Sequence, residues 1–280
     1  MWSKSRGSNE SPIAFLASQC AKFGKYWSPP GISDQDIKYI VDELAIFREE
    51  AAISDPNKFN LSPEKFDTAV NTYNKHTVGS DNWGKVELVN IPPIVKQPIV
   101  YSLNDALQRI ALPYQLMLNL NPCLGTPNGE SRTITKTPFL YRMLMRANTQ
   151  TRQWEKDNAA SFDSCRSGSS ALQAALVRNL RAELGFWLGE HVASVFNDFE
   201  KFFDSIDIPI LLQEAIHCNF PPQLLSFLLQ QHLAPRAIQA NGYTSEAMIV
   251  YKSILAGCMA SVDLTRVYLR RNTQTHRQQI

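Results

Sequence analysis

The sequence predicts an α+β fold that is mostly helical and contains a small antiparallel sheet. Apolar residues recur at helical spacing along much of the chain, most clearly as a leucine at every fourth position from Leu172 to Leu188. The pair Asn241-Gly242 separates two β-favouring runs, which is a strong hairpin signal. Residues 191–196 indicate a further strand, and the acidic residue Asp198 follows it. A few short strands among many helices favour the α+β class.

The first half of the chain is expected to begin with a poorly ordered arm over residues 1–30, which ends in Ser-Pro-Pro. A short helix is predicted over 34–50. Residues 75–83 indicate a glycine-containing loop, and Pro and Gly cluster over 121–130 as a turn into a strand at Arg132.

The stretch from Ser131 to Trp154 contains five basic residues and no acidic one, interleaved with aromatic residues. Such a pattern suits contact with a phosphate backbone. The alternative is a solvated helix face whose spacing buries Leu140, Leu144 and Met145. For the arginines after Arg132 this alternative is the preferred interpretation.

Ser169 is a candidate N-cap for a long amphipathic helix. Its leucine stripe comprises Leu172, Leu176, Leu180, Leu184 and Leu188. We expect this stripe to pack in the protein core and not to act as a zipper for a partner. The helix leads into the strand that precedes Asp198.

Two proline-initiated helices follow. Asp207 is the expected cap of the first, with Pro209 in its first turn. Pro221-Pro222 begins the second, which is almost wholly apolar and is therefore expected to be buried. After the hairpin, Gly257 precedes a turn into the last helix.

Composition sets limits on function. The net charge is +2, but residues 131–280 carry 16 basic and 12 acidic side chains, which permits nucleic-acid binding. The five cysteines lack CxxC spacing, which argues against a zinc site or a disulfide framework. No signal peptide or transmembrane run is recognisable, so we expect an intracellular protein without a membrane partner.

The segment 195–207, Val-Phe-Asn-Asp-Phe-Glu-Lys-Phe-Phe-Asp-Ser-Ile-Asp, resembles motif A of reverse transcriptases of the non-LTR-retrotransposon type. The resemblance implies that Asp198 and the backbone carbonyl of Phe199 hold catalytic Mg²⁺. It implies that Phe199 lies at the bound nucleotide and that the ring of Phe203 guards its sugar. An acid after a strand is also a common helix cap or turn residue, and this alternative stays open.

Two further segments support the resemblance. Gly257 and Ser261 match motif B, a turn into a helix that packs against the template base and the incoming nucleotide. Arg132 matches the fingers arginine that contacts the triphosphate. The chain departs from the family pattern at Ala256, where glutamine is usual, and at Thr133, where proline is usual.

The resemblance divides the chain into four parts: an N-terminal arm and helical extension (1–64), a fingers-like region (65–190), a partial palm with motifs A and B (191–269) and a polar tail (270–280). The family's aromatic-x-Asp-Asp hairpin and its thumb do not occur in this sequence. We therefore expect an RNA-directed DNA polymerase domain, truncated after motif B and inactive alone.

The implied partners are an RNA template, a DNA primer and deoxynucleotides, and the resemblance suggests action in the nucleus. Two alternatives stay open. One is a non-catalytic retroelement remnant that binds nucleic acid through basic fingers. The other is a helical interaction protein in which the strand followed by an acid is coincidental.

Overall fold

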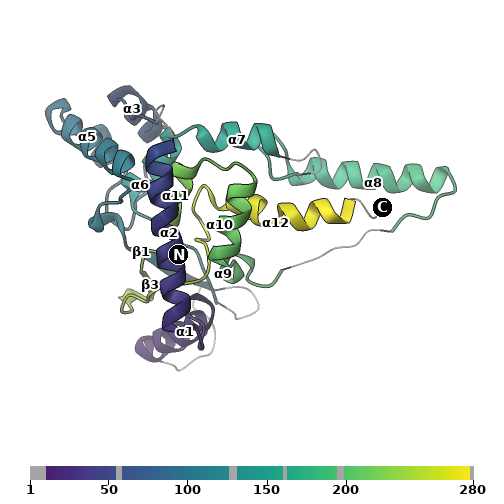
Figure 1. The fold of residues 1–280 in the computed structure, drawn as a ribbon, viewed down its shortest axis with the longest axis horizontal. Helices are drawn as coiled ribbons and strands as arrows, with labels where there is room; N and C mark the ends of the chain where they lie inside the picture. The colour runs from purple at the N-terminus through teal and green to yellow at the C-terminus, as the bar shows by residue number, and fades with distance from the viewer. Residues whose placement is uncertain (1–10, 55–58, 126–130, 160–162, 194–198, 278–280) are drawn as a thin grey trace.

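The computed structural model describes residues 11–54, 59–125, 131–159, 163–193 and 199–277. In these ranges the chain forms twelve α-helices and four strands, so the predicted α+β class is confirmed (Figure 1). No helix within them combines the length and apolarity needed to cross a membrane. The helices are α1 (Pro12–Trp27), α2 (Asp34–Ser54), α3 (Pro63–Asn71), α4 (Lys85–Val89), α5 (Pro93–Arg109), α6 (Phe139–Ala147), α7 (Gln150–Asn158), α8 (Ala171–Trp187), α9 (Phe202–Ser205), α10 (Ile208–His217), α11 (Pro222–His232) and α12 (Ser261–Arg277), with a 3-10 turn at Tyr114–Leu116.

The sheet is mixed, with the strand order β2-β1-β3-β4. Its strands are β1 (Asn119–Gly125), β2 (Ser131–Thr133), β3 (Arg236–Ala240) and β4 (Tyr243–Thr244). The outer pairs are antiparallel, but the central strands β1 and β3 run parallel. The expectation of a wholly antiparallel sheet was therefore wrong. The helices α6 to α11 lie between β1 and β3, and a connection of this length can return the chain to the same end of the sheet.

Three local signals in the second half of the chain are confirmed, and one predicted strand is not. Asp207 caps α10, because its carboxylate accepts a hydrogen bond from the Ile210 amide at 3.2 Å. Helix α11 is buried along most of its length. The hairpin turns at Asn241 and Gly242, both with positive φ, as a tight two-residue turn requires. Residues 191–193 are not in a strand, and 194–198 lie outside the described residues.

Helix α1 contradicts the expectation of a poorly ordered N-terminal arm. Its N-cap Ser11 accepts from the Ala14 amide, and the helix packs against β3. Phe23 and Trp27 lie one turn apart with stacked rings and are almost fully buried. They form a second apolar cluster with Cys123 and Ile238. The Ser-Pro-Pro segment ends this helix and does not mark a disordered arm.

Helix α8 contradicts the expectation that its leucine stripe packs in the protein core. Its N-cap is Ser170, one residue after the predicted one. Each leucine of the stripe is more than half exposed, so the stripe is not core. A four-residue repeat exceeds the 3.6-residue helical turn, so the stripe winds around the helix by about 40° at each step. In Figure 1, α8 extends away from the body of the molecule, and the C-terminal part of α12 runs beside its start.

The Gly-x-Asp-x-Trp loop at residues 79–83 fixes the start of α6. The Asp81 carboxylate accepts hydrogen bonds from the backbone amides of Phe139, at 2.9 and 3.0 Å, and Leu140, at 3.4 Å. These amides are among those that a helix N-terminus leaves without partners. A Cβ at Gly79 would lie 2.1 Å from the Phe139 nitrogen, so the loop can approach the helix only with glycine there.

Arg266 joins α12 to the helical part of the molecule. Its guanidinium pairs with Asp263 one turn earlier, with Asp163 and with Glu155 of α7. Burial raises the pKa of Asp263 to about 6, a rise that Arg266 opposes and the charges of Glu155 and Asp163 reinforce. Three carboxylates around one guanidinium fix where the helix that follows Gly257 docks.

Candidate functional site

Three segments that are far apart in the sequence meet beside the sheet. The Ile254 amide donates to the Phe203 carbonyl at 2.9 Å, and the Ser253 amide donates to the Ile206 carbonyl at 2.8 Å. The Thr135 amide donates to the Ala256 carbonyl at 2.6 Å. The segment after Asp198, the loop before α12 and the strand region after Arg132 are therefore joined through their backbones. We call this arrangement the three-segment junction.

Gly257 lies at the closest approach within the junction. Its φ is +114°, a conformation that side chains strongly disfavour. A Cβ there would lie 2.9 Å from the Thr135 carbonyl oxygen and 3.2 Å from Cγ2 of Ile134. Two features therefore require glycine at position 257: its positive φ, and the absence of a Cβ next to the Thr135 carbonyl.

Replacing Gly257 with alanine is expected to lower the free energy of unfolding by about 2 kcal/mol and to move the loop away from Thr135. The matched control is Gly24→Ala, inside α1, where a Cβ meets nothing within 4 Å. That change should raise stability by about 0.5–1 kcal/mol because alanine favours the helix. Denaturant titration measures both. Equal effects of the two changes would contradict the close packing at Gly257.

A buried cluster of polar side chains lies beside the junction and forms hydrogen bonds with its loop before α12. The Arg236 guanidinium donates to the Ser253 hydroxyl at 2.8 Å and to the His232 carbonyl at 2.9 Å. It also lies 4.8 Å from the centre of the Trp27 ring. The indole N–H of Trp27 in turn donates to the Asp204 carboxylate at 2.7 Å. Helix α1, the segment after Asp198 and the loop before Gly257 therefore share one polar core.

The electrostatics of this cluster follow from its burial. Burial raises the pKa of Asp204, and the Trp27 hydrogen bond and the charge of Arg236 oppose that rise. Burial, with a smaller contribution from Arg236, lowers the pKa of His232 to about 3. His232 is therefore neutral at pH 7, and its Nδ1 accepts a hydrogen bond from the Leu255 amide at 3.2 Å. The neutral ring holds the loop two residues before Gly257.

The predicted nucleotide-contacting residues differ in their exposure. Arg132 is exposed on β2, opposite Leu124 of β1. Phe203 is half-buried and packs against the main apolar core. Phe199 is exposed, and its ring centre lies 5.2 Å from that of Phe202.

Ser261 and Asp198 complete the predicted set. Ser261 is buried at the start of α12, and its hydroxyl donates to the Leu255 carbonyl, so the side chain closes the turn around Gly257. Asp198 lies outside the described residues.

The carboxylates near the junction do not fit a complete Mg²⁺ site. In the described part of the chain, no group of three or more His, Cys, Asp or Glu side chains is arranged to hold a metal. Asp204 is engaged by Trp27 and lies near Arg236, and Asp207 caps α10. A bound Mg²⁺ would depend on Asp198, the Phe199 carbonyl and groups from elsewhere.

The basic residues of α6 have a structural role. Arg142 and Arg146 both lie over the Tyr73 ring, at 5.5 and 5.1 Å from its centre. The Tyr73 hydroxyl donates to the Arg142 carbonyl at 2.8 Å. These two arginines therefore help to pack α6 on the segment directly after α3, which favours a structural role for Arg142 and Arg146 over phosphate binding.

Sequence reasoning missed Trp27, His232 and Arg236. One signal was available, because Arg236 stands in an otherwise apolar run after an apolar helix. A charged residue in such a run needs a buried partner. Phe23 and Trp27, four residues apart, were likewise compatible with a packed helix face.

No protein-family model matches the chain, and no curated protein sequence matches it. Among the features described above, the three-segment junction has the most specific geometry.

Proposed function

We propose that this chain forms the fingers and partial palm of a reverse-transcriptase-type polymerase and that the three-segment junction holds an incoming deoxynucleotide. The proposal rests on the backbone hydrogen bonds that join three segments: residue 135, residues 203–206 and residues 253–256. The first and the last of these segments are more than 100 residues apart in the sequence. Each of these segments resembles one that surrounds the nucleotide in that family. If the three sequence resemblances to the family were coincidental, there would be no reason for the three segments to contact one another in the fold.

Each predicted residue has a role in this proposal. Arg132 contacts the triphosphate, and the Phe203 ring excludes a 2′-hydroxyl. Gly257 lets the loop before α12 lie against Thr135, and Ser261 holds that loop in shape beside the bound nucleotide. Asp198 and the Phe199 carbonyl supply part of the coordination of Mg²⁺.

The polymeric partners in this proposal are an RNA template and a DNA primer. Two-metal phosphoryl transfer needs several converging carboxylates, and the described residues provide no such set. We therefore expect the chain alone to bind nucleotide and primer–template without extending the primer.

Binding of a fluorescent deoxynucleoside triphosphate in the presence of Mg²⁺ tests the proposal. We expect Asp198→Asn to weaken binding by about tenfold, the loss of one charge-assisted contact. The matched control is Glu200→Gln, which removes an exposed carboxylate two residues later and should leave affinity unchanged. Nucleotide affinity that is absent in the unmodified chain, or equal in both variants, would contradict the proposal. Salt-sensitive binding to primer–template alone would favour the non-catalytic remnant.

A further inference from the structure

Arg266, near the start of α12, is surrounded by more negative charge than it can neutralise. Its guanidinium pairs with the carboxylates of Asp263 and Asp163 and lies 3.2 Å from that of Glu155. The four side chains are between 10% and 17% exposed. One positive charge against three carboxylates leaves an excess of two negative charges in a place where water screens them weakly. We call these four residues the Arg266 cluster.

The Arg266 cluster joins α12 to two other segments. Asp263 and Arg266 belong to α12, Glu155 belongs to α7, and Asp163 belongs to the loop that leads into α8. Helix α12 begins at Ser261, whose hydroxyl closes the turn that precedes the helix. A change in how firmly α12 is held therefore also bears on the three-segment junction.

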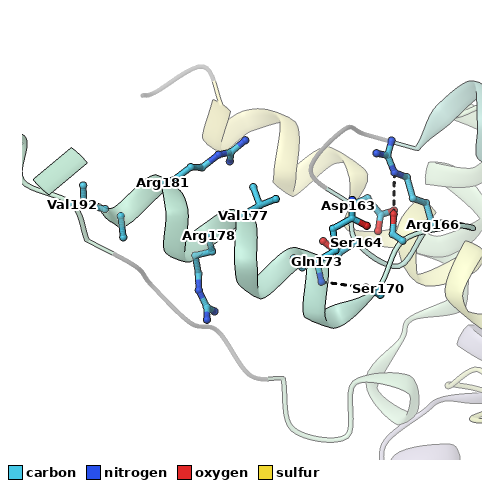
Figure 2. Close-up of a pocket in the computed structure, with 12 residues that line it drawn as sticks. Asp163, Ser164, Arg166, Ser170, Gln173, Val177, Arg178, Arg181 and Val192 are labelled. Atoms are coloured by element: carbon cyan, nitrogen blue, oxygen red, sulfur yellow. Dashed lines mark hydrogen bonds between the residues drawn. The ribbon is translucent and has the colours of Figure 1, made fainter. Parts of the chain in front are cut away.

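Two hollows give the carboxylates of the cluster access to solvent. Glu155 and Asp263 line a hollow of about 270 Å³, which Arg152 and Cys165 also border. Asp163 lines a second hollow, of about 400 Å³, beside α8 (Figure 2). The cluster can therefore gain or lose a proton without unfolding of the helices around it.

The other titratable side chains around the cluster face solvent or lie further away. Those of α7 and of the loop before α8 are exposed: Arg152, Lys156, Asp157, Cys165 and Arg166. Helix α10, which also packs against α12, contributes Glu214 and the exposed His217. Glu214 acts on the pKa of the Cys218 thiol together with Arg270, which lies about two turns after Asp263. The charges that act on Asp263 are therefore those of the cluster itself.

Like charges held this close together favour the uptake of a proton. Burial raises the pKa of Asp263 to about 6, a rise that Arg266 opposes and the charges of Glu155 and Asp163 reinforce. When α12 moves away from α7 and the loop, Asp263 regains water and loses both acidic neighbours, so its pKa returns toward 3.8. The docked helix thus binds this proton more tightly than the undocked helix does. Through Asp263, docking is therefore favoured at mildly acidic pH and weakened as the pH rises through 6.

We propose that the Arg266 cluster is a proton-dependent clamp, which holds α12 against α7 and the loop before α8 more tightly when one of its carboxylates is protonated. The clamp loosens as the medium changes from mildly acidic to neutral. It does not depend on nucleotide binding at the three-segment junction, so either proposal can fail without the other.

Hydrogen exchange of the backbone amides of residues 261–269 tests the clamp, after correction for the intrinsic effect of pH on exchange. The comparison is with Asp263→Asn, because asparagine does not titrate and keeps an oxygen that accepts from Arg266. At pH 7.5 we expect the unmodified chain to exchange faster than the variant. At pH 5 the ratio of the two rates should be about tenfold smaller, the change that pKa values of 3.8 and about 6 produce.

The ratio isolates Asp263, because any titration of His232 affects both chains equally. Circular dichroism checks that the variant folds. A ratio that is the same at both pH values would overturn the proposal, as would faster exchange in Asp263→Asn than in the unmodified chain at pH 7.5.

A second variant changes the clamp without altering α12. Glu155→Gln keeps an oxygen that accepts from the Ser167 amide but removes a charge that raises the pKa of Asp263. Relative to Asp263→Asn in the same background, α12 exchange should therefore level off at a lower pH than in the unmodified chain. The matched control is Asp105→Asn, which removes the exposed partner of Arg109 on α5 and should leave this pH unchanged. Equal shifts in the two variants, or no shift in Glu155→Gln, would overturn the proposal.

Discussion

Replacing Arg236 with alanine is expected to lower the free energy of unfolding by about 3–5 kcal/mol. The guanidinium is buried, donates to the Ser253 hydroxyl and the His232 carbonyl, and lies over the Trp27 ring. Alanine removes all of these contacts, leaves a cavity beside Trp27 and takes its positive charge away from Asp204. Denaturant titration followed by circular dichroism measures the change.

Two further variants calibrate this result. Arg109→Ala removes an exposed arginine that pairs with Asp105 at 2.8 Å, and should cost no more than about 0.5 kcal/mol. Arg236→Lys keeps the positive charge but loses the planar guanidinium that reaches two acceptors. Its loss in free energy of unfolding should therefore lie between those of Arg236→Ala and Arg109→Ala. If Arg236→Ala were as mild as Arg109→Ala, the buried cluster would not be what supports the loop before Gly257.

Acid is expected to destabilise the protein through His232. The pKa of this buried ring falls from 6.5 in the unfolded chain to about 3 in the folded one. Between these values the unfolded chain binds a proton that the folded protein excludes. Protonation of His232 therefore costs no stability above pH 6.5, and the free energy of unfolding falls as the pH falls from 6.5 toward 3, by about 1.4 kcal/mol per pH unit and about 5 kcal/mol in total.

His232→Gln isolates this contribution, because glutamine does not titrate. The variant is expected to be less stable at pH 7, since the Leu255 amide loses the ring nitrogen that accepts its hydrogen bond. Its stability should also fall less steeply below pH 6.5. The control is His76→Gln at an exposed loop position. If the free energy of unfolding fell with pH equally steeply in the unmodified chain and in His232→Gln, the folded protein would not be keeping His232 unprotonated.

Local signals predicted local structure well in this chain. Asp207 with Pro209 predicted the start of α10, Pro221-Pro222 predicted a buried α11, and Asn241-Gly242 predicted the β3–β4 hairpin. Each depends on backbone chemistry within a few residues, which the sequence contains directly.

Long-range arrangements could not be predicted in the same way. The parallel pairing of β1 with β3 depends on the path of six intervening helices. The leucine stripe of α8 was expected to pack in the core, but each of its leucines is more than half exposed, and this depends on where α8 lies relative to the rest of the fold. Likewise, the link from Trp27 through Arg236 to the loop before Gly257 spans most of the chain.

The most direct test of the proposed nucleotide binding at the three-segment junction is the preference between a deoxynucleoside triphosphate and the matching ribonucleoside triphosphate, measured by competition binding. If the proposal is right, the unmodified chain prefers the deoxy form, because the proposed position of the Phe203 ring would block a 2′-hydroxyl. Phe203→Ala should abolish that preference, while Phe199→Ala, an exposed ring whose backbone carbonyl is retained, should keep it. A preference that is unchanged in Phe203→Ala, or absent from the unmodified chain, would contradict the assignment of this junction as a nucleotide pocket.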